Sequence, residues 1–386
     1  MKSFGKSVRA VVFLPSIETG GVERNAIIVA NHLVDCGYST SLTYTRIVET
    51  MRHRFHENVQ LLCIGKRVRF PFVHPRIIDV LVMFRGYMQY LKREKLHGNT
   101  VVISFQSNIV AIIGARLAGV PVVVRVSNHP SHVKYESGMI QKVSEKLKPF
   151  FYRFADVVIT NSEVNSKLFR HRLSVPVKTI YNPIDPDKLR EKSKEAVEHP
   201  WLILKDLPVL ISVGRLVKQK NFSFLIKSFF EVLKQIDARL IILGEGKERE
   251  NLEAIIDDLT LHDKVDLPGY YSNVHSMVAK ADLFVLSSNF EGMPNALLEA
   301  IAVGTPAIST NCLSGPSEIL CGGEAGDLVP INDTSAMAEA ILTNLKNSER
   351  TQGLFFKARN KLLEFDEQTI LSKYRKVLMD LVIVNR

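Results

Sequence analysis

Short apolar runs alternate with helical patterns along the whole chain. Ten runs, most of them rich in Val and Ile, are four to seven residues long, the length of buried strands. Apolar residues recur at helical spacing over residues 24–36, 221–235, 296–303 and 365–384. Strands that alternate with helices predict a parallel α/β sheet. The predicted strands are residues 8–14, 40–44, 101–105, 121–126, 157–160, 209–213, 239–243, 264–267, 283–286 and 307–310.

This alternation breaks once, near the middle of the chain. From residue 181 to residue 208, prolines and charged residues replace the strand–helix order. A chain of 386 residues exceeds one small domain, and no sequence repeat links its halves. We therefore expect one α/β domain over residues 1–184, a second over residues 185–364, and a final helix within residues 365–386. Because ligands of open α/β sheets bind at the carboxyl ends of strands, two such domains predict a site in the cleft between them.

The segment after the strand at 283–286 carries the most chemistry. A glycine turn and a proline precede the next helix, so free backbone N–H groups are expected beyond the strand's carboxyl end, where they suit an anion. Two carboxylates, Glu291 and Glu299, stand eight positions apart in the same segment. Carboxylates that accept paired hydroxyls, beside amides that take phosphate, predict a nucleotide-sugar site. The loop residues expected there are Gly292, Met293, Pro294 and Asn295.

Three loops together resemble one enzyme family. The pair Glu291 and Glu299 resembles the E-x7-E signature of the retaining glycosyltransferases of family 4. Residues 214–221, GRLVKQKN, resemble that family's G-R-x-x-x-x-K-x loop, and Gly20 with Gly21 resemble its N-terminal glycine loop. The three matches span nearly the whole chain in the expected order. The resemblance implies the GT-B fold, in which two Rossmann-like domains face a central cleft and the last helix crosses back to the first domain.

The resemblance also implies roles for the charged residues of these motifs. Glu299 would accept both ribose hydroxyls, and Glu291 would position the sugar, with a nucleophilic or charge-stabilising role as the alternative. Arg215 and Lys220 would stabilise the diphosphate as its negative charge grows in the transition state. Two fixed cations would replace a divalent metal, and the sequence shows no Asp-x-Asp or ligand cluster. We therefore expect no metal and no cofactor beyond the nucleotide-sugar co-substrate.

Five further positions are weaker candidates. Gly20 and Gly21 would let the backbone approach the donor phosphate, although a plain turn is the simpler interpretation. His129 follows the strand at 121–126 roughly where the family places a histidine near the donor sugar or acceptor, although a lone histidine is more often structural. Arg125 is a candidate for an acceptor phosphate. Tyr270 would flank the base, although the glycine before it equally suits an ordinary βα turn.

Charge is distributed unevenly between the halves of the chain. Residues 1–200 hold 30 basic and 16 acidic residues, a net of +14, whereas residues 201–386 hold 20 and 24, a net of −4. No helix-turn-helix, RRM or KH motif accompanies the positive charge, so nucleic acid is disfavoured. Basic residues interleaved with aromatics over residues 65–95 and 142–153 suit an anionic bilayer, and a solvated surface over core aromatics is the alternative. The leading candidates for acceptor or membrane contact are Lys66, Arg67 and Arg69.

Several classes of protein are excluded by simple patterns. The four cysteines form no C-x-x-C pair, so neither a zinc site nor a disulfide framework is indicated. No run of 18 uncharged apolar residues exists, and the apolar run at 10–14 is too short for a secretory signal. We expect a cytoplasmic protein that binds peripherally at the inner face of the cytoplasmic membrane.

The resemblance leads to a specific expected reaction. A hexose or N-acetylhexosamine would move with retention from a nucleoside-diphosphate sugar to a polyprenyl-diphosphate-linked oligosaccharide, in lipopolysaccharide or capsule assembly. A UDP-sugar is favoured because residues 314–320, SGPSEIL, resemble a G-P-x-E-I-L element of a subgroup that acts on surface glycans. Two alternatives are an inactive GT-B module that binds nucleotide or glycan, and an α/β cleft protein with other chemistry, such as a phosphorylase or a sugar-phosphate isomerase.

Overall fold

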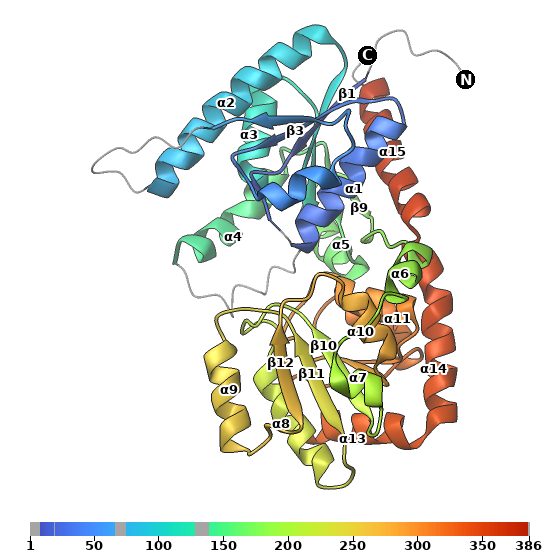
Figure 1. The fold of residues 1–386 in the computed structure, drawn as a ribbon. Helices are drawn as coiled ribbons and strands as arrows, with labels where there is room; N and C mark the ends of the chain where they lie inside the picture. The colour runs from blue at the N-terminus through green and yellow to red at the C-terminus, as the bar shows by residue number, and fades with distance from the viewer. Residues whose placement is uncertain (1–7, 19, 66–74, 128–138, 385–386) are drawn as a thin grey trace. The chain divides into compact units, whose positions relative to one another are not determined.

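The computed structural model describes residues 8–18, 20–65, 75–127 and 139–384 (Figure 1). The predicted site residues His129, Lys66, Arg67 and Arg69 lie outside these ranges. The described residues divide into two compact units. The first unit holds the residues up to Asn182 together with those from Gln368 onward, and the second holds Pro183–Glu367.

The first unit is built on a seven-stranded parallel sheet. Its strand order is β5-β3-β1-β6-β7-β8-β9, and each neighbouring pair is parallel. The strands are β1 (Arg9–Phe13), β3 (Ser39–Tyr44), β5 (Gln60–Cys63), β6 (Thr100–Ser104), β7 (Val122–Val126), β8 (Val157–Thr160) and β9 (Val177–Thr179). A two-stranded pair, β2 (Ser16–Ile17) and β4 (Arg46–Ile47), lies apart from it.

Helices cover both faces of this sheet, which is why its central strands are apolar throughout. In β1, Ala10 and Val12 join a core with α1, whereas Val11 and Phe13 join a separate core with α2 and α3. Figure 1 shows α2, α3 and α4 on one side of the sheet and α1 and α15 on the other. These helices and their neighbours are α1 (Gly21–Asp35), η1 (Glu49–Arg54), α2 (Pro75–His97), α3 (Asn108–Ala118), α4 (Met139–Tyr152), α5 (Glu163–Arg170) and α15 (Glu367–Val384).

The last helix confirms the predicted return of the chain. After the second unit is complete, α15 places Ile370, Tyr374 and Leu378 in the same core as the inward-facing residues of β1 and α1. All three side chains are fully or almost fully buried. The apolar spacing over residues 365–384 therefore marks a helix that belongs to the first unit.

The second unit is built on a six-stranded parallel sheet of order β12-β11-β10-β13-β14-β15. From β10, the chain adds β11 and β12 toward one edge of the sheet. It then returns to the centre and adds β13, β14 and β15 toward the other edge, so the strand order reverses between β10 and β13. Such a reversal is the usual ligand position of an open α/β sheet. The strands are β10 (Val209–Val213), β11 (Arg239–Leu243), β12 (Val265–Gly269), β13 (Leu283–Leu286), β14 (Ala307–Thr310) and β15 (Leu328–Val329).

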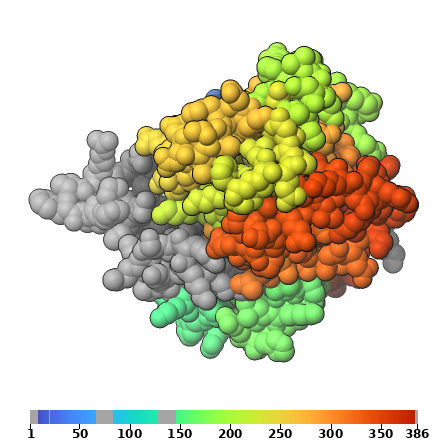
Figure 2. All heavy atoms as spheres, turned by 90° about the horizontal axis from the view of Figure 1, so that it is seen from below, coloured from blue at the N-terminus to red at the C-terminus, as the bar shows by residue number. Residues whose placement is uncertain are grey.

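Helices surround this second sheet as well. Figure 2 looks onto a surface of this unit where the yellow residues of α8 and α9 meet the orange-red residues of α13 and α14. The helices are α6 (Pro186–Ser193), α7 (Pro200–Leu204), α8 (Phe222–Leu233), α9 (Arg249–Asp258), α10 (Val274–Lys280), α11 (Asn295–Val303), α12 (Pro316–Ile319), η3 (Cys321–Gly323), α13 (Thr334–Lys346), α14 (Ser348–Lys361) and η4 (Leu362–Phe365). The predicted parallel α/β class is confirmed in both units.

Within the described ranges, no helix is long and apolar enough to cross a bilayer.

Candidate active site

Two loops meet where the strand order of the second unit reverses. One follows β10 and the other follows β13, and hydrogen bonds join them directly. The backbone N–H of Asn289 donates to the carbonyl of Gln219 at 2.8 Å, and its side-chain Nδ2 donates to the carbonyl of Lys218 at 2.8 Å. The Gln219 amide returns a bond to the carbonyl of Phe290 at 3.0 Å. The two predicted motifs, about seventy residues apart in sequence, therefore form one continuous structure.

An ion pair between Lys220 and Glu291 lies at the centre of this structure. The Lys220 Nζ donates to Glu291 Oε1 at 2.6 Å, and the two side chains are 16% and 8% exposed. The same carboxylate oxygen accepts a bond from Ser288 Oγ at 2.8 Å. The Ser314 hydroxyl donates to the Glu291 carbonyl at 2.7 Å, which fixes the backbone beneath the carboxylate. A buried carboxylate is thus held by a cation and a hydroxyl, as a charge withdrawn from water requires.

The segment after β14 packs against the loop that carries Glu291. Burial, together with the nearby Glu291 charge, raises the pKa of the Cys312 thiol to about 12, so this side chain stays neutral. Gly315 has φ +85, and a Cβ there would lie 2.7 Å from the Gly292 carbonyl oxygen and from Pro294 Cδ. Only glycine permits this approach. The Ser314–Gly315 pair of the SGPSEIL segment therefore has a structural role, because it packs against the loop that carries Glu291.

Arg215, the other predicted diphosphate ligand, has a different environment. It follows β10 by two residues and is exposed. Its guanidinium makes no hydrogen bond or ion pair with another residue that the structure describes. Beside it, Gly214 and Gly244 bring two loops into contact, because a Cβ on Gly244 would lie 1.9 Å from the Gly214 carbonyl oxygen. The β10 loop therefore presents one cation, Lys220, that is paired with a carboxylate, and two exposed cations, Arg215 and Lys218, whose charged groups have no partner among the described residues.

Glu299 lies in the middle of α11 and faces α10. Its carboxylate is 15% exposed, and its Oε2 lies 3.3 Å from His275 Nε2. The helix begins at Asn295, one residue before the predicted start, and Pro294 occupies the preceding cap position. The E-x7-E spacing thus places Glu291 in the loop and Glu299 about one turn into the helix. The Glu299 side chain is partly buried there rather than fully solvated.

Two family models match the chain in succession. One, described as Glycosyltransferase Family 4, matches residues 19–188, and the other, described as Glycosyl transferases group 1, matches residues 193–361. An N-acetylgalactosamine-N,N'-diacetylbacillosaminyl-diphospho-undecaprenol 4-alpha-N-acetylgalactosaminyltransferase of Campylobacter jejuni is 30% identical over 277 residues, which are 70% of this chain and 73% of that protein. The chain belongs to glycosyltransferase family 4. The predicted enzyme class, a glycosyltransferase of the hexosyltransferase type, is confirmed with it.

Two further similarities extend this assignment. An uncharacterized glycosyltransferase of Methanocaldococcus jannaschii is 38% identical over 201 residues, which are 51% of this chain and 49% of that protein. The chain thus spans about half the length of that relative. The crystal structure of Anabaena HepE in complex with UDP and glucose superposes with a TM-score of 0.77 at 18% identity, covering 96% of this chain and 99% of that chain. The predicted GT-B fold is confirmed by this likeness.

In the first unit of this glycosyltransferase, the glycine pair is covered by a carboxylate. Gly20 precedes the first turn of α1, and a Cβ on it would lie 2.3 Å from Glu23 Oε2. The Glu23 side chain is itself buried and accepts a bond from Gln106 Nε2 at 2.7 Å. A donor phosphate beside Gly20 and Gly21 would meet this negative charge. The predicted phosphate contact at this loop therefore requires Glu23 to move or to be protonated.

Arg125 is completely enclosed within the first unit. It is 1% exposed, and its guanidinium lies over the Phe105 ring at 5.7 Å. Its three nitrogens donate to Tyr374 Oη at 2.7 Å, to Ser127 Oγ at 2.7 Å and to Asn182 Oδ1 at 2.5 Å. No surface of the guanidinium is left for an acceptor phosphate. This placement favours a structural role, which ties β7 to α15, over the predicted acceptor contact.

The remaining predicted ligand, Tyr270, follows β12 and is 66% exposed. Gly269 before it has φ +90, and a Cβ there would lie 2.8 Å from Glu245 Oε1, so the turn itself requires glycine. The ring is therefore available at the carboxyl end of the sheet, as contact with a base requires. The structure describes no group of three or more His, Cys, Asp or Glu that is suited to hold a metal ion.

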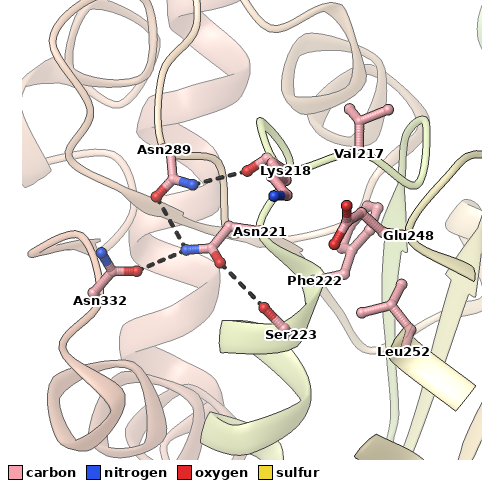
Figure 3. Close-up of a pocket in the computed structure, with 9 residues that line it drawn as sticks. All are labelled: Val217, Lys218, Asn221, Phe222, Ser223, Glu248, Leu252, Asn289 and Asn332. Atoms are coloured by element: carbon pink, nitrogen blue, oxygen red, sulfur yellow. Dashed lines mark hydrogen bonds between the residues drawn. The ribbon is translucent and has the colours of Figure 1, made fainter. Parts of the chain in front are cut away.

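A cavity of about 380 Å³ lies behind the joined loops (Figure 3). Asn221, the last residue of the GRLVKQKN motif, adopts a left-handed conformation with φ 52. Its Nδ2 donates to Asn289 Oδ1 at 3.1 Å and to Asn332 Oδ1 at 2.8 Å, so one amide joins three loops. Sequence reasoning missed this amide, as it missed Ser288, Ser314 and His275. The cavity is lined by Val217, Lys218, Asn221, Phe222, Ser223, Glu248, Leu252, Asn289 and Asn332.

Proposed function

We propose that this glycosyltransferase moves a hexose or N-acetylhexosamine from a UDP-sugar to a polyprenyl-diphosphate-linked oligosaccharide, with retention of configuration. The contact of Lys220 with Glu291 at the sheet's reversal point carries this proposal. It brings the cation of one motif and the carboxylate of another to one place, beside the exposed Arg215. A diphosphate and a sugar that are joined in one molecule require such neighbouring groups.

The charge at these loops favours a diphosphate. Lys220 and Glu291 neutralise each other, whereas the exposed Arg215 and Lys218 add positive charge that no described residue pairs with. As the glycosidic bond breaks, the leaving diphosphate gains negative charge, which Arg215 and Lys220 would stabilise more in the transition state than in the ground state. Glu291, held by Ser288, would accept hydrogen bonds from the sugar hydroxyls and orient the anomeric carbon. Glu299 would accept the ribose hydroxyls.

These two cations would also take the place of a divalent metal. A positively charged side chain beside a leaving diphosphate supplies the electrostatic stabilisation for which many phosphate-handling sites use Mg²⁺. We therefore expect transfer to continue in excess EDTA. Activity that is lost in EDTA and restored by magnesium or manganese would contradict this part of the proposal.

The nucleotide and acceptor are proposed from relatives and from chemistry. UDP is bound in the similar HepE structure, and diphospho-undecaprenol is part of the name of the Campylobacter jejuni relative. A polyprenyl-linked acceptor resides in a membrane, so the enzyme would bind peripherally to the cytoplasmic face of the cytoplasmic membrane. Surface polysaccharide assembly, such as that of lipopolysaccharide or capsule, is the process that such a substrate serves.

The end of α4 offers a described surface for this membrane contact. Leu147, Phe150 and Phe154 are 45%, 49% and 44% exposed, and the rings of Phe150 and Phe154 contact each other. The Arg153 guanidinium lies 4.9 Å from the Phe150 ring centre, and Lys146 is exposed nearby in sequence. Aromatic rings mixed with cations suit the headgroup region of an anionic bilayer. This surface complements the predicted contact through Lys66, Arg67 and Arg69.

A transfer assay with a panel of UDP- and GDP-sugars tests the proposal. Thermal unfolding should shift upward with the correct donor, because a ligand that binds the folded state stabilises it by mass action. Supplying a polyprenyl-diphosphate-linked acceptor should then release UDP and extend the glycan. Donor binding without any turnover on lipid-linked acceptors would instead support the alternative of an inactive binding module.

A further inference from the structure

The carboxylate assigned to the ribose has a partner that no motif predicts. His275 lies in the first turn of α10, which packs against α11, and its Nε2 is 3.3 Å from Glu299 Oε2. The two side chains are only 13% and 15% exposed. A carboxylate withdrawn this far from water is costly unless a donor faces it. His275 is therefore placed to restrict the direction of the Glu299 head group.

The orientation of the His275 ring is fixed by Asn273. The Asn273 Nδ2 donates to the carbonyl of Lys192 at 2.7 Å, and its Oδ1 accepts from the backbone N–H of His275 at 3.2 Å. These two bonds determine which end of the amide is oxygen. The same Oδ1 lies 3.2 Å from His275 Nδ1. One ring nitrogen thus faces an amide oxygen and the other faces a carboxylate oxygen.

This arrangement constrains the hydrogens on the ring. A neutral imidazole has one donor nitrogen and one acceptor nitrogen, whereas an imidazolium donates from both. With the hydrogen on Nδ1 alone, the lone pair of Nε2 would point at the Glu299 carboxylate and repel it. An N–H on Nε2 is therefore the favourable state, and an imidazolium satisfies both oxygens at once.

We propose that His275 is a positioning residue for nucleotide binding: it donates from Nε2 to Glu299 and holds that carboxylate in the direction from which it accepts the ribose hydroxyls. This inference rests on the proposed role of Glu299. A side chain fixed before the ligand arrives loses less freedom on binding, which raises affinity without adding a contact to the ligand. The chemical class that benefits is a nucleoside diphosphate, whether or not it carries a sugar.

The experiment measures UDP affinity by calorimetry in variants of His275. His275→Phe fills the space but cannot donate, so UDP should bind about tenfold more weakly. His275→Gln retains a donor and should recover part of the affinity. The donor KM should rise with the loss of affinity, whereas kcat at saturating donor should stay within about twofold, because the proposal has His275 act through Glu299 on the ribose and not on the sugar or the diphosphate.

The chain offers a matched control in His262. Its Nε2 lies 3.2 Å from Asp257, but these side chains are 68% and 64% exposed. Exposed pairs contribute little, so His262→Phe should leave UDP affinity and KM unchanged. A loss of affinity in both histidine variants would indicate a general effect of removing a histidine and would overturn the proposal.

A double-mutant cycle separates this inference from the proposed function. Glu299→Gln should weaken UDP binding by itself, and His275→Phe should cause little further loss in that background. Fully additive losses would show that His275 acts independently of Glu299, and would overturn the inference alone. Unchanged UDP affinity in Glu299→Gln would remove the assigned donor carboxylate, and the inference with it. If His275→Phe does not fold, His275→Asn, whose shorter side chain cannot reach Glu299, takes its place in the cycle.

Discussion

Two arginines, one in each unit, stand near the carboxyl end of a parallel strand, and their surroundings differ completely. Arg125 in the first unit is buried, and all three of its guanidinium nitrogens donate to groups of the protein itself. Arg215 in the second unit is exposed, and its guanidinium has no partner among the described residues. An arginine near a strand end thus stabilises the interior of the first unit, as Arg125 does, but is available to a ligand in the second unit, as Arg215 is.

The difference shows what marks a binding group in this protein. A cation whose donors are all occupied gains nothing from a ligand unless its own bonds break first. A site for an anion needs charge that the protein leaves incompletely neutralised, and the β10 loop provides it by pairing Lys220 with Glu291 while leaving Arg215 without a partner among the described residues. Position at a strand end therefore suggests a site, but the partners of the side chain decide it.

The largest effect is expected from removing the cation at the centre of the second unit's site. Lys220→Ala should lower kcat by on the order of 10²–10³-fold, the usual loss when one stabilising donor is removed from a developing negative charge. It should also lower the free energy of unfolding by about 3 kcal/mol, since Glu291 is left buried without its cation. Steady-state kinetics and urea unfolding measure the two quantities.

A second substitution separates these two losses. Adding Glu291→Gln to Lys220→Ala removes the unpaired charge, so stability should recover while turnover stays low. Lys227→Ala, an exposed lysine on α8, is the matched control and should change neither quantity. A Lys220→Ala enzyme with kcat within about threefold of the unsubstituted protein would remove Lys220 from the reaction.

Arg125→Met should lower the stability of the protein without changing donor binding. It leaves Tyr374, Ser127 and Asn182 without their common donor, so the free energy of unfolding should fall by about 3 kcal/mol. UDP affinity should not change, because Arg215, Lys220 and Glu299, to which the proposed function assigns the nucleotide, lie in the second unit. Arg172→Met, an exposed arginine of the first unit, should stay within about 0.5 kcal/mol. Unchanged stability with lost transfer to acceptor would instead restore the predicted acceptor contact of Arg125.

The sequence predicted the strands with continuous apolar runs, and missed the partly exposed edge strands β5 and β9 of the first sheet. The run at 209–213 coincides with β10, and the run at 157–160 coincides with β8. The edge strands β5 and β9 were not predicted, because their partly exposed residues, QLLC and VKT, show no continuous apolar run. Burial on both faces produces the apolar run, so a strand whose side chains are partly exposed does not show it.

The site was predictable to the extent that its residues lie within one loop. The spacing of Glu291 and Glu299 and the order of residues 214–221 follow from the backbone of a strand–turn–helix unit, so they are visible locally. The groups that bond to these motif residues cannot be seen in the same way. Ser314 reaches Glu291 from the loop after β14, and Tyr374 reaches Arg125 from 249 positions away. Such contacts depend on tertiary placement, for which a single sequence carries no local signal.

Arg215→Ala tests the other half of the comparison between the two arginines, namely that Arg215 binds a ligand. It should lower kcat by roughly tenfold to a hundredfold, because one of two cations at the leaving diphosphate is lost. The free energy of unfolding should stay within about 0.5 kcal/mol, since the guanidinium supports no described residue. Kinetics with saturating donor, measured beside thermal unfolding, checks both statements. A strongly destabilised variant with normal turnover would make Arg215 a structural residue like Arg125 and would erase the contrast between the two arginines.

The smallest effect concerns the outer surface of the first unit. Lys146 is exposed on α4, next to the exposed Leu147 and near Phe150. If this surface meets an anionic bilayer, Lys146→Ser should weaken binding to anionic vesicles by about 1 kcal/mol, roughly fivefold in the partition coefficient. Lys227→Ser in the second unit removes the same charge from a surface with no such aromatic cluster assigned to it, and should leave partitioning unchanged.

Flotation at low and moderate salt measures both variants, and the attraction should weaken as salt rises, since the Debye length is about 10 Å at 0.1 M. Equal partitioning of the unsubstituted protein into neutral and anionic vesicles would show that charge is not what attracts this enzyme to a membrane. The excess of positive charge in residues 1–200 would then need another anionic partner. The diphosphate of the proposed acceptor is the next candidate.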